Sequence, residues 1–505
     1  MTPHHTEPDI PTVPGTDGAA LEAGSLDPEA GHFPSGPAIV GFLGVALVVL
    51  GASWPSSPFT SKLPGSWIFG IPAAGRPADA PWPSLLFVYG GIVLLVSAWV
   101  SVVARSTRCS LRQLMAILIM WITPLLVSPP LFSRDVYTYG AAGQLVSAGI
   151  NPYSHGLTAL RSSVFFNLSD PLWRSAHAPY GPLFFDLAKT NARLMGHNVF
   201  GTLEGYRFLA TLGLALMAVA VPVLARSYGQ SERRAFSMAV LNPLVLIYLV
   251  GGMHNDALML GLLMAGVALA SRNHPLAGIF LCALATEVKV PAALGIVFIG
   301  WQWAGNDAPP LRRLRYVAQA GAWGAASVAV VSEASGFGWG WLVNLSTPGT
   351  VVSWLDPATA IGLGVSHGLH FLGVAASTHG VIVICRGAAL GLATLVALAL
   401  LVRSERYGLP RAIGWSLLAF VLLGPIVWPW YETWGIAFLA VAGDRWSRRS
   451  VVALSVIGCF ATIPAHVSLS THGLVLVIVI LVALAGSALF VVIRNLDVHP
   501  PLLQR

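Results

Sequence analysis

Long apolar segments recur along the whole chain with short polar connections between them, and this pattern constrains the fold more than any other feature. About 20 apolar residues are enough for a helix to cross the hydrocarbon layer of a membrane. With 55% hydrophobic and 10% charged residues among 505, the chain is too apolar for a water-soluble globule. We therefore predict an all-α polytopic membrane protein with about 13–14 transmembrane helices. The predicted spans are residues 37–54, 84–104, 114–132, 205–225, 235–252, 256–271, 275–288, 290–304, 316–333, 380–402, 413–427, 432–443, 451–465 and 474–493.

The predicted spans belong to one membrane domain over residues 37–495, which is followed by a short cytoplasmic tail at 496–505. Residues 1–36 contain no Lys or Arg and are rich in Pro, Gly, Asp and Glu, so we expect a disordered acidic cytoplasmic tail there and no signal peptide. The two short apolar stretches within 275–304 alternatively form a re-entrant helical hairpin.

Basic residues predict how the chain is oriented in the membrane. Most of the 28 Lys and Arg residues fall in alternate short loops, which the positive-inside rule assigns to the cytoplasm. These residues are Arg105, Arg108, Arg112, Arg226, Arg233, Arg234, Arg272, Arg312, Arg313, Arg315, Arg403, Arg406, Arg411, Arg445, Arg448, Arg449, Arg494 and Arg505. The long polar loops at 133–204 and 334–379 then lie on the outer face of the plasma membrane, and both termini are cytoplasmic.

Charge and cysteine content limit the function further. The net charge of +7 is explained by membrane topology, so nucleic acid is not predicted as a partner, whereas membrane lipids are. The four cysteines are scattered and form no CxxC pair, which indicates neither a disulfide framework nor a metal site. The sequence also has no P-loop, GxGxxG or serine-hydrolase motif, and this argues against soluble nucleotide chemistry.

An acidic residue opens the first long outer loop. Arg134 and Asp135 follow the apolar segment 114–132, so we expect them at the membrane boundary, where ionised groups are costly unless they are paired or hydrated. A carboxylate at that place can accept a proton from a sugar hydroxyl, which makes Asp135 a candidate catalytic base. The alternative is a salt bridge between Arg134 and Asp135 at the end of the helix.

Aromatic and polar residues on the same predicted face suit a sugar ligand. The candidates are Tyr137, Asn151, Tyr153 and Tyr180 in the first outer loop and Trp430, Tyr431 and Glu432 in a later turn. Their rings either stack on sugars or anchor the chain at the membrane interface. The pattern between residues 137 and 148 predicts a short amphipathic helix that lies along the interface.

A tight turn between two apolar segments contains His254, Asn255 and Asp256. Asn255 is a suitable helix N-cap and Asp256 suits the positive end of the helix dipole, so capping alone explains the Asn at 255 and half explains the Asp at 256. His254 has no capping role, which favours a function in ligand binding. All three are candidate binding residues.

Glu287 and Lys289 interrupt the apolar stretch 276–303. A Lys at the centre of a membrane helix costs ~3 kcal/mol, which a bound phosphate would offset by charge pairing and hydrogen bonds. The alternative is an internal pair between Glu287 and Lys289, which needs a broken helix because residues two apart do not share a helix face. Arg386, near the outer end of its span, is a second phosphate candidate or an ordinary residue that reaches toward the interface.

Taken together, these motifs resemble those of the actinobacterial polyprenyl-phosphomannose-dependent α-(1→6)-mannosyltransferases, which are membrane glycosyltransferases of the GT-C superfamily. The resemblance covers roughly residues 114–303 and a further block at 428–434. The matching segments are FSRDVYTY at 132–139, GINPY at 149–153, APYGP at 178–182, LNPLVLI at 241–247, GGMHND at 251–256 and the surroundings of Lys289. Two positions depart from the expected pattern, because residue 256 is Asp in place of Glu and residue 287 is Glu in place of an apolar or small residue.

The resemblance implies a GT-C-type bundle and an enzyme of cell-wall biogenesis. Its donor would be polyprenyl monophosphomannose and its acceptor a lipid-anchored mannan, as in the α-(1→6)-linked backbone of lipomannan, with inversion in a single displacement. Asp135 matches the base, while Lys289, with Arg134 or Arg386, would stabilise the departing phosphate. A lipid phosphate is a good leaving group, so no cofactor is implied and a divalent metal would help without being required.

A polytopic transporter is the leading alternative, because most chains this apolar move solutes. Against it, the two halves show no evident repeat and the outer loops are long and polar, although an interrupted central helix with charges would favour it. A lipid flippase or scaffolding subunit of cell-envelope assembly is a third hypothesis.

Overall fold

The computed structural model describes residues 33–54, 57, 59, 66–68, 71–72, 82–353, 356–461 and 486. Most of the predicted N-terminal tail lies outside the described residues, as do the C-terminal tail at 496–505 and all but one residue of the last predicted span. The regular elements of the described part are helices apart from two short antiparallel strands, β1 (Ser66–Ile68) and β2 (Ile71–Pro72). The prediction of an all-α architecture is therefore confirmed.

Four helices in the described part of the chain are long and apolar enough to cross a membrane by themselves. They are α1 (Ser35–Ala52), α2 (Trp82–Arg105, extended to Arg108 by the 3-10 turn η1), α7 (Val199–Ser227) and α15 (Thr378–Val402). A fifth candidate is a helix pair bent by 116°, formed by the π-helix η5 (Val245–Gly251) and α9 (Asp256–Ala270). The protein is thus embedded in a membrane, while the number of crossings stays a prediction.

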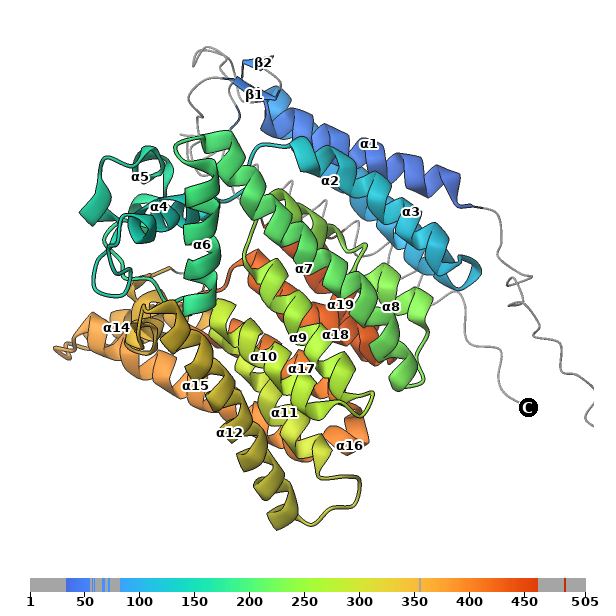
Figure 1. The fold of residues 1–505 in the computed structure, drawn as a ribbon, viewed down its shortest axis with the longest axis vertical. Helices are drawn as coiled ribbons and strands as arrows, with labels where there is room; N and C mark the ends of the chain where they lie inside the picture. Colours follow the sequence, from blue (N-terminus) through green and yellow to red (C-terminus); the bar gives the residue numbers. More distant parts are fainter. Residues whose placement is uncertain are drawn as a thin grey trace, which may run out of the picture.

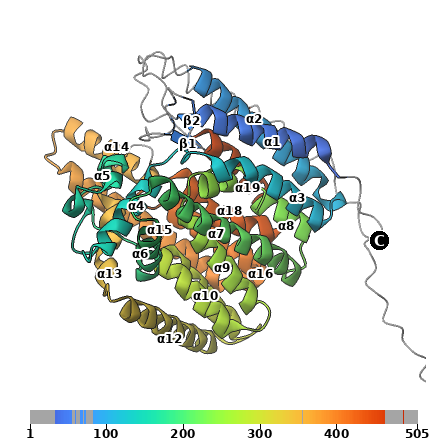
Figure 2. The same cartoon turned by 45° about the horizontal axis from the view of Figure 1, so that its top comes forward.

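Other helices complete the bundle, most of them shorter, although α12 has 26 residues. They are α3 (Leu111–Ile122), α8 (Glu232–Ala239), α10 (Pro275–Val288), α11 (Ala293–Trp303), α12 (Pro310–Ser335), α16 (Ser404–Tyr407), α17 (Leu409–Leu422), α18 (Pro429–Ala442) and α19 (Arg445–Phe460). In Figures 1 and 2, α1 and α2 lie on one flank and α12 on the opposite flank, with α7, α9 and α10 between them.

Glycine allows the central helices α7 and α9 to pack closely. A Cβ atom at Gly213 of α7 would lie 2.2 Å from the backbone of Ala257 in α9, so only a glycine fits this crossing. Ala257 directly follows Asp256 at the start of α9. The contact therefore fixes the position of a buried carboxylate in the middle of the bundle.

The helix before Asp135 ends earlier than the sequence analysis predicted. α3 ends at Ile122 and continues only as a 3-10 turn, η2 (Thr123–Val127), because Pro124 has no backbone N–H to continue an α-helix. Asp135 is consequently not the outer end of a membrane helix, and it begins a separate helix, α4 (Asp135–Ser147).

A buried arginine holds the chain between η2 and α4 in place. Arg207 of α7 is 2% exposed, and its guanidinium donates hydrogen bonds to the carbonyl oxygens of Leu125 and Ser128. These carbonyls lie past the last α-helical turn and need partners outside the helix. An ion pair of 3.1 Å with Glu204 balances the charge of Arg207.

The predicted span 235–252 is interrupted at Asn242 and Pro243. The Asn242 side chain accepts a hydrogen bond from the backbone N–H of Leu244 (3.0 Å) and donates one to Ser455 Oγ (2.7 Å). α8 ends before this point, and the chain resumes as the π-helix η5.

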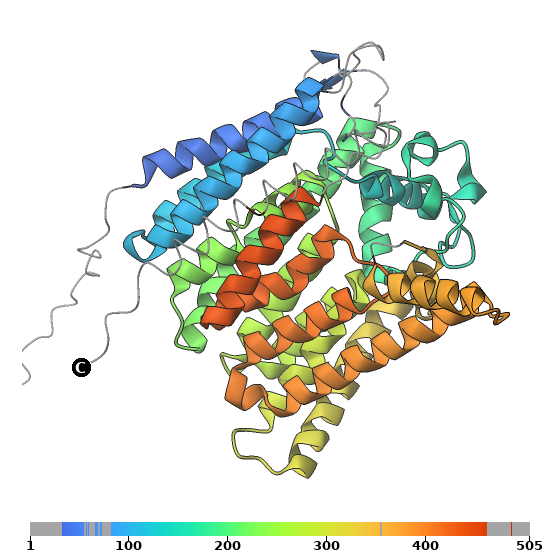
Figure 3. The same ribbon diagram turned by 180° about the vertical axis from the view of Figure 1, so that it is seen from behind.

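The two loops predicted on the outer face lie together at one end of the bundle (Figure 3). Their short helices are α4, η3 (Leu157–Leu160), α5 (Val164–Leu168), η4 (Pro171–Trp173) and α6 (Pro182–Met195) in the first loop, and α13 (Gly340–Val343), η7 (Asn344–Thr350) and α14 (Pro357–Phe371) in the second. Asn344 Nδ2 donates to the Tyr153 carbonyl (3.1 Å) and Thr347 Oγ1 donates to the His177 carbonyl (2.9 Å). The loops thus form one layer over the bundle.

Candidate active site

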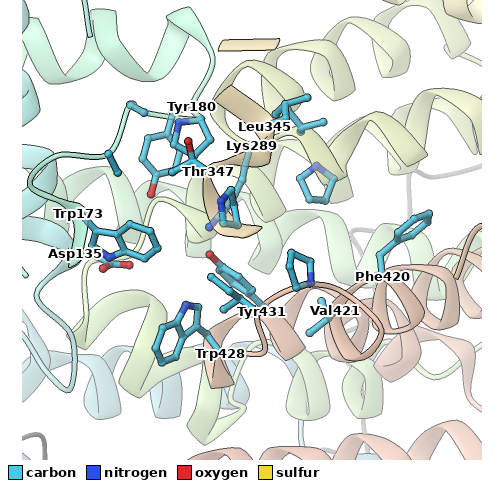
Figure 4. Close-up of a pocket in the computed structure, with 18 of the residues that line it drawn as sticks. Asp135, Trp173, Tyr180, Lys289, Leu345, Thr347, Phe420, Val421, Trp428 and Tyr431 are labelled. Atoms are coloured by element: carbon cyan, nitrogen blue, oxygen red, sulfur yellow. The ribbon is translucent and has the colours of Figure 1, made fainter. Parts of the chain in front are cut away.

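A pocket of about 560 Å³ lies where the two outer loops meet the bundle. Figure 4 shows Asp135 and Trp173 at one end of it, Lys289 and Tyr431 in the middle, and Phe420 and Val421 at the far end. One end is therefore polar and aromatic, and the other is apolar.

Apolar side chains of the helices α11, α15 and α17 line the far end of the pocket. They are Ala293, Leu294 and Val297 of α11, Leu390 of α15, and Phe420 and Val421 of α17, with Pro425 and Ile426 in the segment that follows. We call the region lined by these residues the apolar arm. None of the described residues of α11, α15 and α17 that line it is charged. An aliphatic chain is the kind of group that such a surface binds.

Asp135 is the acidic group at the polar end. It is the first residue of α4, and its backbone N–H donates to Ser133 Oγ at 3.1 Å. Burial raises the pKa of the Asp135 carboxyl to about 7, the positive charge of Lys289 lowers this pKa, and the negative charge of Asp256 raises it further. A carboxylate with a pKa near neutrality can take up a proton during a reaction and release it afterwards.

Lys289 lies at a break between two helices. Its backbone is extended (φ −158°, ψ 124°) between α10 and the 3-10 turn η6 (Val290–Ala292). Its ammonium donates to both carboxylate oxygens of Asp256, at 2.8 and 2.9 Å. Nζ also lies 4.3 Å from the ring centroid of Tyr431 and 5.3 Å from that of Trp434, which are cation–π distances.

Asp256 is fully buried and accepts a third hydrogen bond, because Trp434 Nε1 lies 2.7 Å from its Oδ1. It is also the first residue of α9, where the helix dipole favours a negative charge. The described residues that line the pocket do not include Asp256. Asp256 therefore holds Lys289 in place from behind.

The structure corrects the capping role expected for Asn255. Asn255 occupies the N-cap position of α9, but its backbone is α-helical (φ −61°, ψ −16°), and its side chain makes no capping hydrogen bond. An N-cap side chain reaches the helix N–H groups from an extended backbone. Asn255 Oδ1 instead accepts a hydrogen bond from the Tyr139 hydroxyl at 3.3 Å.

His254 lies behind Asp135. Its Nδ1 is 3.5 Å from Asp135 Oδ2, and its ring is fully buried. The ring stacks on Trp430 with centroids 4.2 Å apart, and Trp430 stacks on Trp428 at 5.1 Å. Trp428 lines the pocket, whereas the described lining includes neither His254 nor Trp430.

Several candidate residues of the first outer loop support the pocket without lining it. Asn151 accepts from the Tyr153 N–H (2.9 Å) and donates to the Phe337 carbonyl (3.1 Å), which ties the two loops together. Tyr153 donates from its hydroxyl to the Tyr180 carbonyl (3.0 Å). Of the tyrosines predicted in this loop, Tyr180 lines the pocket, as does Tyr431 from the later turn.

The short helix predicted between residues 137 and 148 is present as α4, which begins two residues earlier, at Asp135, and it is more buried than an interfacial helix would be. Tyr137 is fully buried, and its hydroxyl has no hydrogen-bond partner among the described residues. Tyr139, two residues later, faces the pocket. Tyr139 lines the pocket in place of Tyr137 because of how α4 packs. This helix contacts α5, α6 and α7, and Tyr137 is enclosed among them.

Glu287 and Lys289 do not form the internal pair considered above. Glu287 Oε1 accepts from Ser332 Oγ (3.0 Å) in α12, and Oε2 accepts from the Leu183 N–H (3.3 Å) at the start of α6. The helix break turns Lys289 the other way, toward Asp256. Glu287 thus joins α10 to an outer-loop helix and lies outside the described lining of the pocket.

The other two candidate phosphate ligands also lie outside the described lining of the pocket. Arg386 is buried and donates to the carbonyl oxygens of Gly349 (2.7 Å) and Val351 (2.5 Å) and to Thr359 Oγ1 (3.0 Å). Its guanidinium therefore binds backbone and hydroxyl groups of the second outer loop and holds that loop in its conformation. The second candidate, Arg134, is the residue directly before α4.

Glu432 points away from the pocket. A Cβ atom at Gly458 of α19 would lie 3.2 Å from Glu432 Oε2, so the carboxyl faces the interior of the bundle. Oε2 has no hydrogen-bond partner among the described residues. The structure gives Glu432 no contact with the pocket.

Three tryptophans of the site were not singled out as binding residues from the sequence. Trp428 and Trp434 belong to the same short motif as Trp430 and Tyr431, so their proximity in sequence was an available signal. Trp173 is the last residue of η4, whose N-terminus is capped by the Asp170 carboxylate. Nothing in the sequence alone indicates that the Trp173 side chain faces the pocket.

Two family models match the chain. One, described as alpha-(1->6)-mannopyranosyltransferase, N-terminal domain, matches residues 38–305, and one described as the MptB C-terminal domain matches residues 358–493. No solved structure matches the chain.

Individual relatives carry the same description. A probable alpha-(1->6)-mannopyranosyltransferase of Mycolicibacterium smegmatis is 33% identical over 460 residues, which cover 83% of this chain and 81% of the relative. Alpha-(1->6)-mannopyranosyltransferase A of Mycobacterium tuberculosis is 32% identical over 446 residues, covering 83% and 82%. Alpha-(1->6)-mannopyranosyltransferase B of Corynebacterium glutamicum is 28% identical over 486 residues, covering 89% and 80%.

Proposed function

The chain belongs to the alpha-(1->6)-mannopyranosyltransferase family, and from this premise we propose that it moves mannose from polyprenyl monophosphomannose to the 6-hydroxyl of a lipid-anchored mannoside. The product would be an α-(1→6) linkage, as in the backbone of lipomannan. The reaction would take place on the outer face of the plasma membrane.

One observation carries the choice of donor: the pocket joins a polar end to an apolar arm. Polyprenyl phosphomannose has the same division, with a charged sugar phosphate attached to a long hydrocarbon chain. In our proposal the hydrocarbon lies along Leu294, Val297 and Phe420, and the phosphate lies at Lys289. The mannose then reaches the end of the pocket that contains Asp135.

The chemistry follows from the two charged groups. The Asp135 carboxylate takes the proton from the acceptor's 6-hydroxyl while that oxygen attacks the anomeric carbon. The bond between the anomeric carbon and the phosphate oxygen breaks, and polyprenyl phosphate leaves with both bonding electrons. Lys289 stabilises the negative charge that grows on the phosphate.

A single base is enough for this reaction. With a β-linked donor and an α-linked product, the displacement inverts the anomeric carbon in one step and forms no covalent enzyme intermediate. Because a phosphate monoester is a good leaving group, we propose that no cofactor is required. A divalent cation would assist the departure without being essential.

Aromatic side chains would hold the sugars. Trp173 and Trp428 lie near Asp135 in Figure 4, and the ring of Tyr431 lies beside Lys289. Flat aromatic rings bury the apolar faces of sugars and leave the hydroxyl groups free for hydrogen bonds. We propose that these rings orient the mannose and the acceptor.

A transporter is favoured by one observation, the two helix breaks beside charged residues at His254–Asp256 and at Lys289, because carriers bind their substrates at such breaks. The similarity to mannosyltransferases favours the transferase. An assay decides between the two functions, since a carrier makes no new glycosidic bond.

The test uses the purified full-length protein in lipid vesicles, with polyprenyl phosphomannose carrying radiolabelled mannose and a short α-(1→6)-linked mannoside as acceptor. We expect a labelled product that an α-(1→6)-mannosidase digests. Labelled donor that crosses the vesicle membrane without forming a longer mannoside would contradict the proposal.

A further inference from the structure

We propose that His254 is a positioning residue for Asp135, to which its Nδ1–H donates a hydrogen bond from behind the pocket. The bond would fix which carboxylate oxygen faces the acceptor hydroxyl. This inference rests on the proposed function, because it assigns His254 a role through the proposed base.

The distance between the two side chains supports this pairing. His254 Nδ1 lies 3.5 Å from Asp135 Oδ2, and a movement of about 0.5 Å would bring the two atoms to hydrogen-bond length. The imidazole is fully buried, and neither of its nitrogens has a hydrogen-bond partner among the described residues. Because buried polar atoms are nearly always paired in folded proteins, the nearby carboxylate is the natural acceptor.

Close packing against the His254 ring restricts its orientation. Trp430 stacks on one face with an interplanar angle of 20°, and Trp428 stacks on Trp430 at 6°. A Cβ atom at Gly252 would lie 2.8 Å from His254 Cδ2, so the backbone at Gly252 also approaches the ring closely. Met253, between them, adopts a left-handed backbone (φ 55°), which costs about 1 kcal/mol for such a residue. The turn thus holds the imidazole in a defined orientation.

His254 is placed to act through Asp135 and not on the ligand itself. Asp135 and Trp428 line the pocket, whereas His254 is not among the described lining residues. A neutral imidazole with its proton on Nδ1 can donate to the carboxylate without adding a charge to the pocket. The charged groups that shift the pKa of Asp135 are Lys289, which lowers it, and Asp256 and Asp170, which raise it.

Two substitutions separate the hydrogen bond from the packing. His254→Phe keeps a ring for the stack with Trp430 and removes the donor, whereas His254→Asn keeps an N–H donor near the position of Nδ1 and removes the ring. His274→Phe is a matched control, because His274 is exposed at the start of α10. Each protein is assayed in vesicles for kcat, for the KM of the donor and for the pH dependence of kcat.

We expect His254→Phe to lower kcat by about tenfold to a hundredfold, because a hydrogen bond to a charged group is lost. The donor KM should stay within about twofold of the wild-type value, since His254 does not touch the donor. The acidic limb of the pH profile should move up by about one pH unit, because a lost donor makes the carboxylate easier to protonate. His254→Asn should keep kcat within about threefold of wild type, and His274→Phe should match wild type.

Equal losses of kcat in the Phe and Asn variants with an unmoved acidic limb would overturn the proposal, as would a Phe variant with wild-type kcat. If the Phe variant does not fold, His254→Asn decides by itself, since a loss of more than about tenfold would contradict a role that the amide can fill. Failure of the proposed function would look different, because the wild-type protein would then form no mannoside product.

Discussion

Both carboxylate oxygens of Asp256 accept hydrogen bonds from the Lys289 ammonium, at 2.8 and 2.9 Å, although the residues are 33 positions apart in the chain. An ammonium group has three hydrogens, so this pairing leaves one for a ligand in the pocket. The pair lies where two helices are interrupted, at the start of α9 and the end of α10. The cation is thereby held in place in the pocket that also contains the proposed base.

We expect Lys289→Met to raise the KM of the donor by tenfold or more, because the phosphate loses its cation, worth about 1.4 kcal/mol or more. The KM of the acceptor should change much less. Separate KM measurements for the two substrates check this, and an equal rise in both would indicate a structural lysine.

Arg386→Met serves as the matched control for Lys289→Met. It removes a buried cation that binds backbone carbonyls of the second outer loop, so it should lower thermal stability and leave the ratio of the two KM values unchanged.

Lys289→Met also leaves the Asp256 carboxylate without its cation, at a cost of about 3–5 kcal/mol of stability. The double variant with Asp256→Asn should regain much of that stability and still bind the donor poorly.

The transfer rate should fall as the pH drops below about 7. Burial raises the pKa of Asp135 to about 7, and a base must be ionised to act, so protonation below this pH removes the active form. We expect kcat/KM to decline about tenfold per pH unit on the acidic side and to level off above about pH 8. Lys289→Met should move this limb upward, because the Lys289 charge lowers the pKa of Asp135. A rate that is constant between about pH 5 and 8 would exclude a base with this pKa.

Filling the apolar arm should discriminate between donors of different chain length. Val297→Trp narrows the arm between α11 and α17, so it should raise the KM of a long polyprenyl donor by about tenfold and leave a short-chain analogue within about twofold. Val219→Trp is the control, because Val219 is 70% exposed on α7. If Val297→Trp affects long and short donors equally, the hydrocarbon does not lie in this arm.

Labelling from outside the cell tests the orientation of the site. Arg161 and Arg406 are both exposed, the first in the loop that contains Asp135 and the second in a predicted cytoplasmic loop. We expect a membrane-impermeant thiol reagent to label Arg161→Cys on intact cells and to label Arg406→Cys only after lysis. The reverse pattern would place the pocket on the cytoplasmic side.

The membrane architecture and several pocket residues were predictable from the sequence because they depend on local patterns. The length of the apolar segments predicts the helices. Loop length and the bias in basic residues predict that the loops at 133–204 and 334–379 lie on the same side of the membrane. In the structure these two loops contact each other through hydrogen bonds from Asn344 and Thr347. Asp135, Tyr180 and Lys289 were singled out as polar residues in unusual places, and the structure places all three along one pocket.

Other features depend on contacts between distant segments, which no local pattern contains. Tyr137 and Tyr139 look alike in the sequence, and only the packing of α4 decides that Tyr139 faces the pocket. The binding of Lys289 by Asp256 requires the crossing of α9 and α10. Pro124, in contrast, was a visible signal that the helix before Asp135 ends early.

The most direct test of the proposed mechanism is the transfer rate of Asp135→Asn, measured in vesicles with saturating donor and acceptor after thermal unfolding has shown that the variant is folded. Asn keeps the size of the side chain and cannot take up the acceptor's proton, so we expect the rate to fall by about 10²–10⁴-fold. A folded Asp135→Asn variant that transfers mannose at close to the wild-type rate would show that Asp135 is not the base.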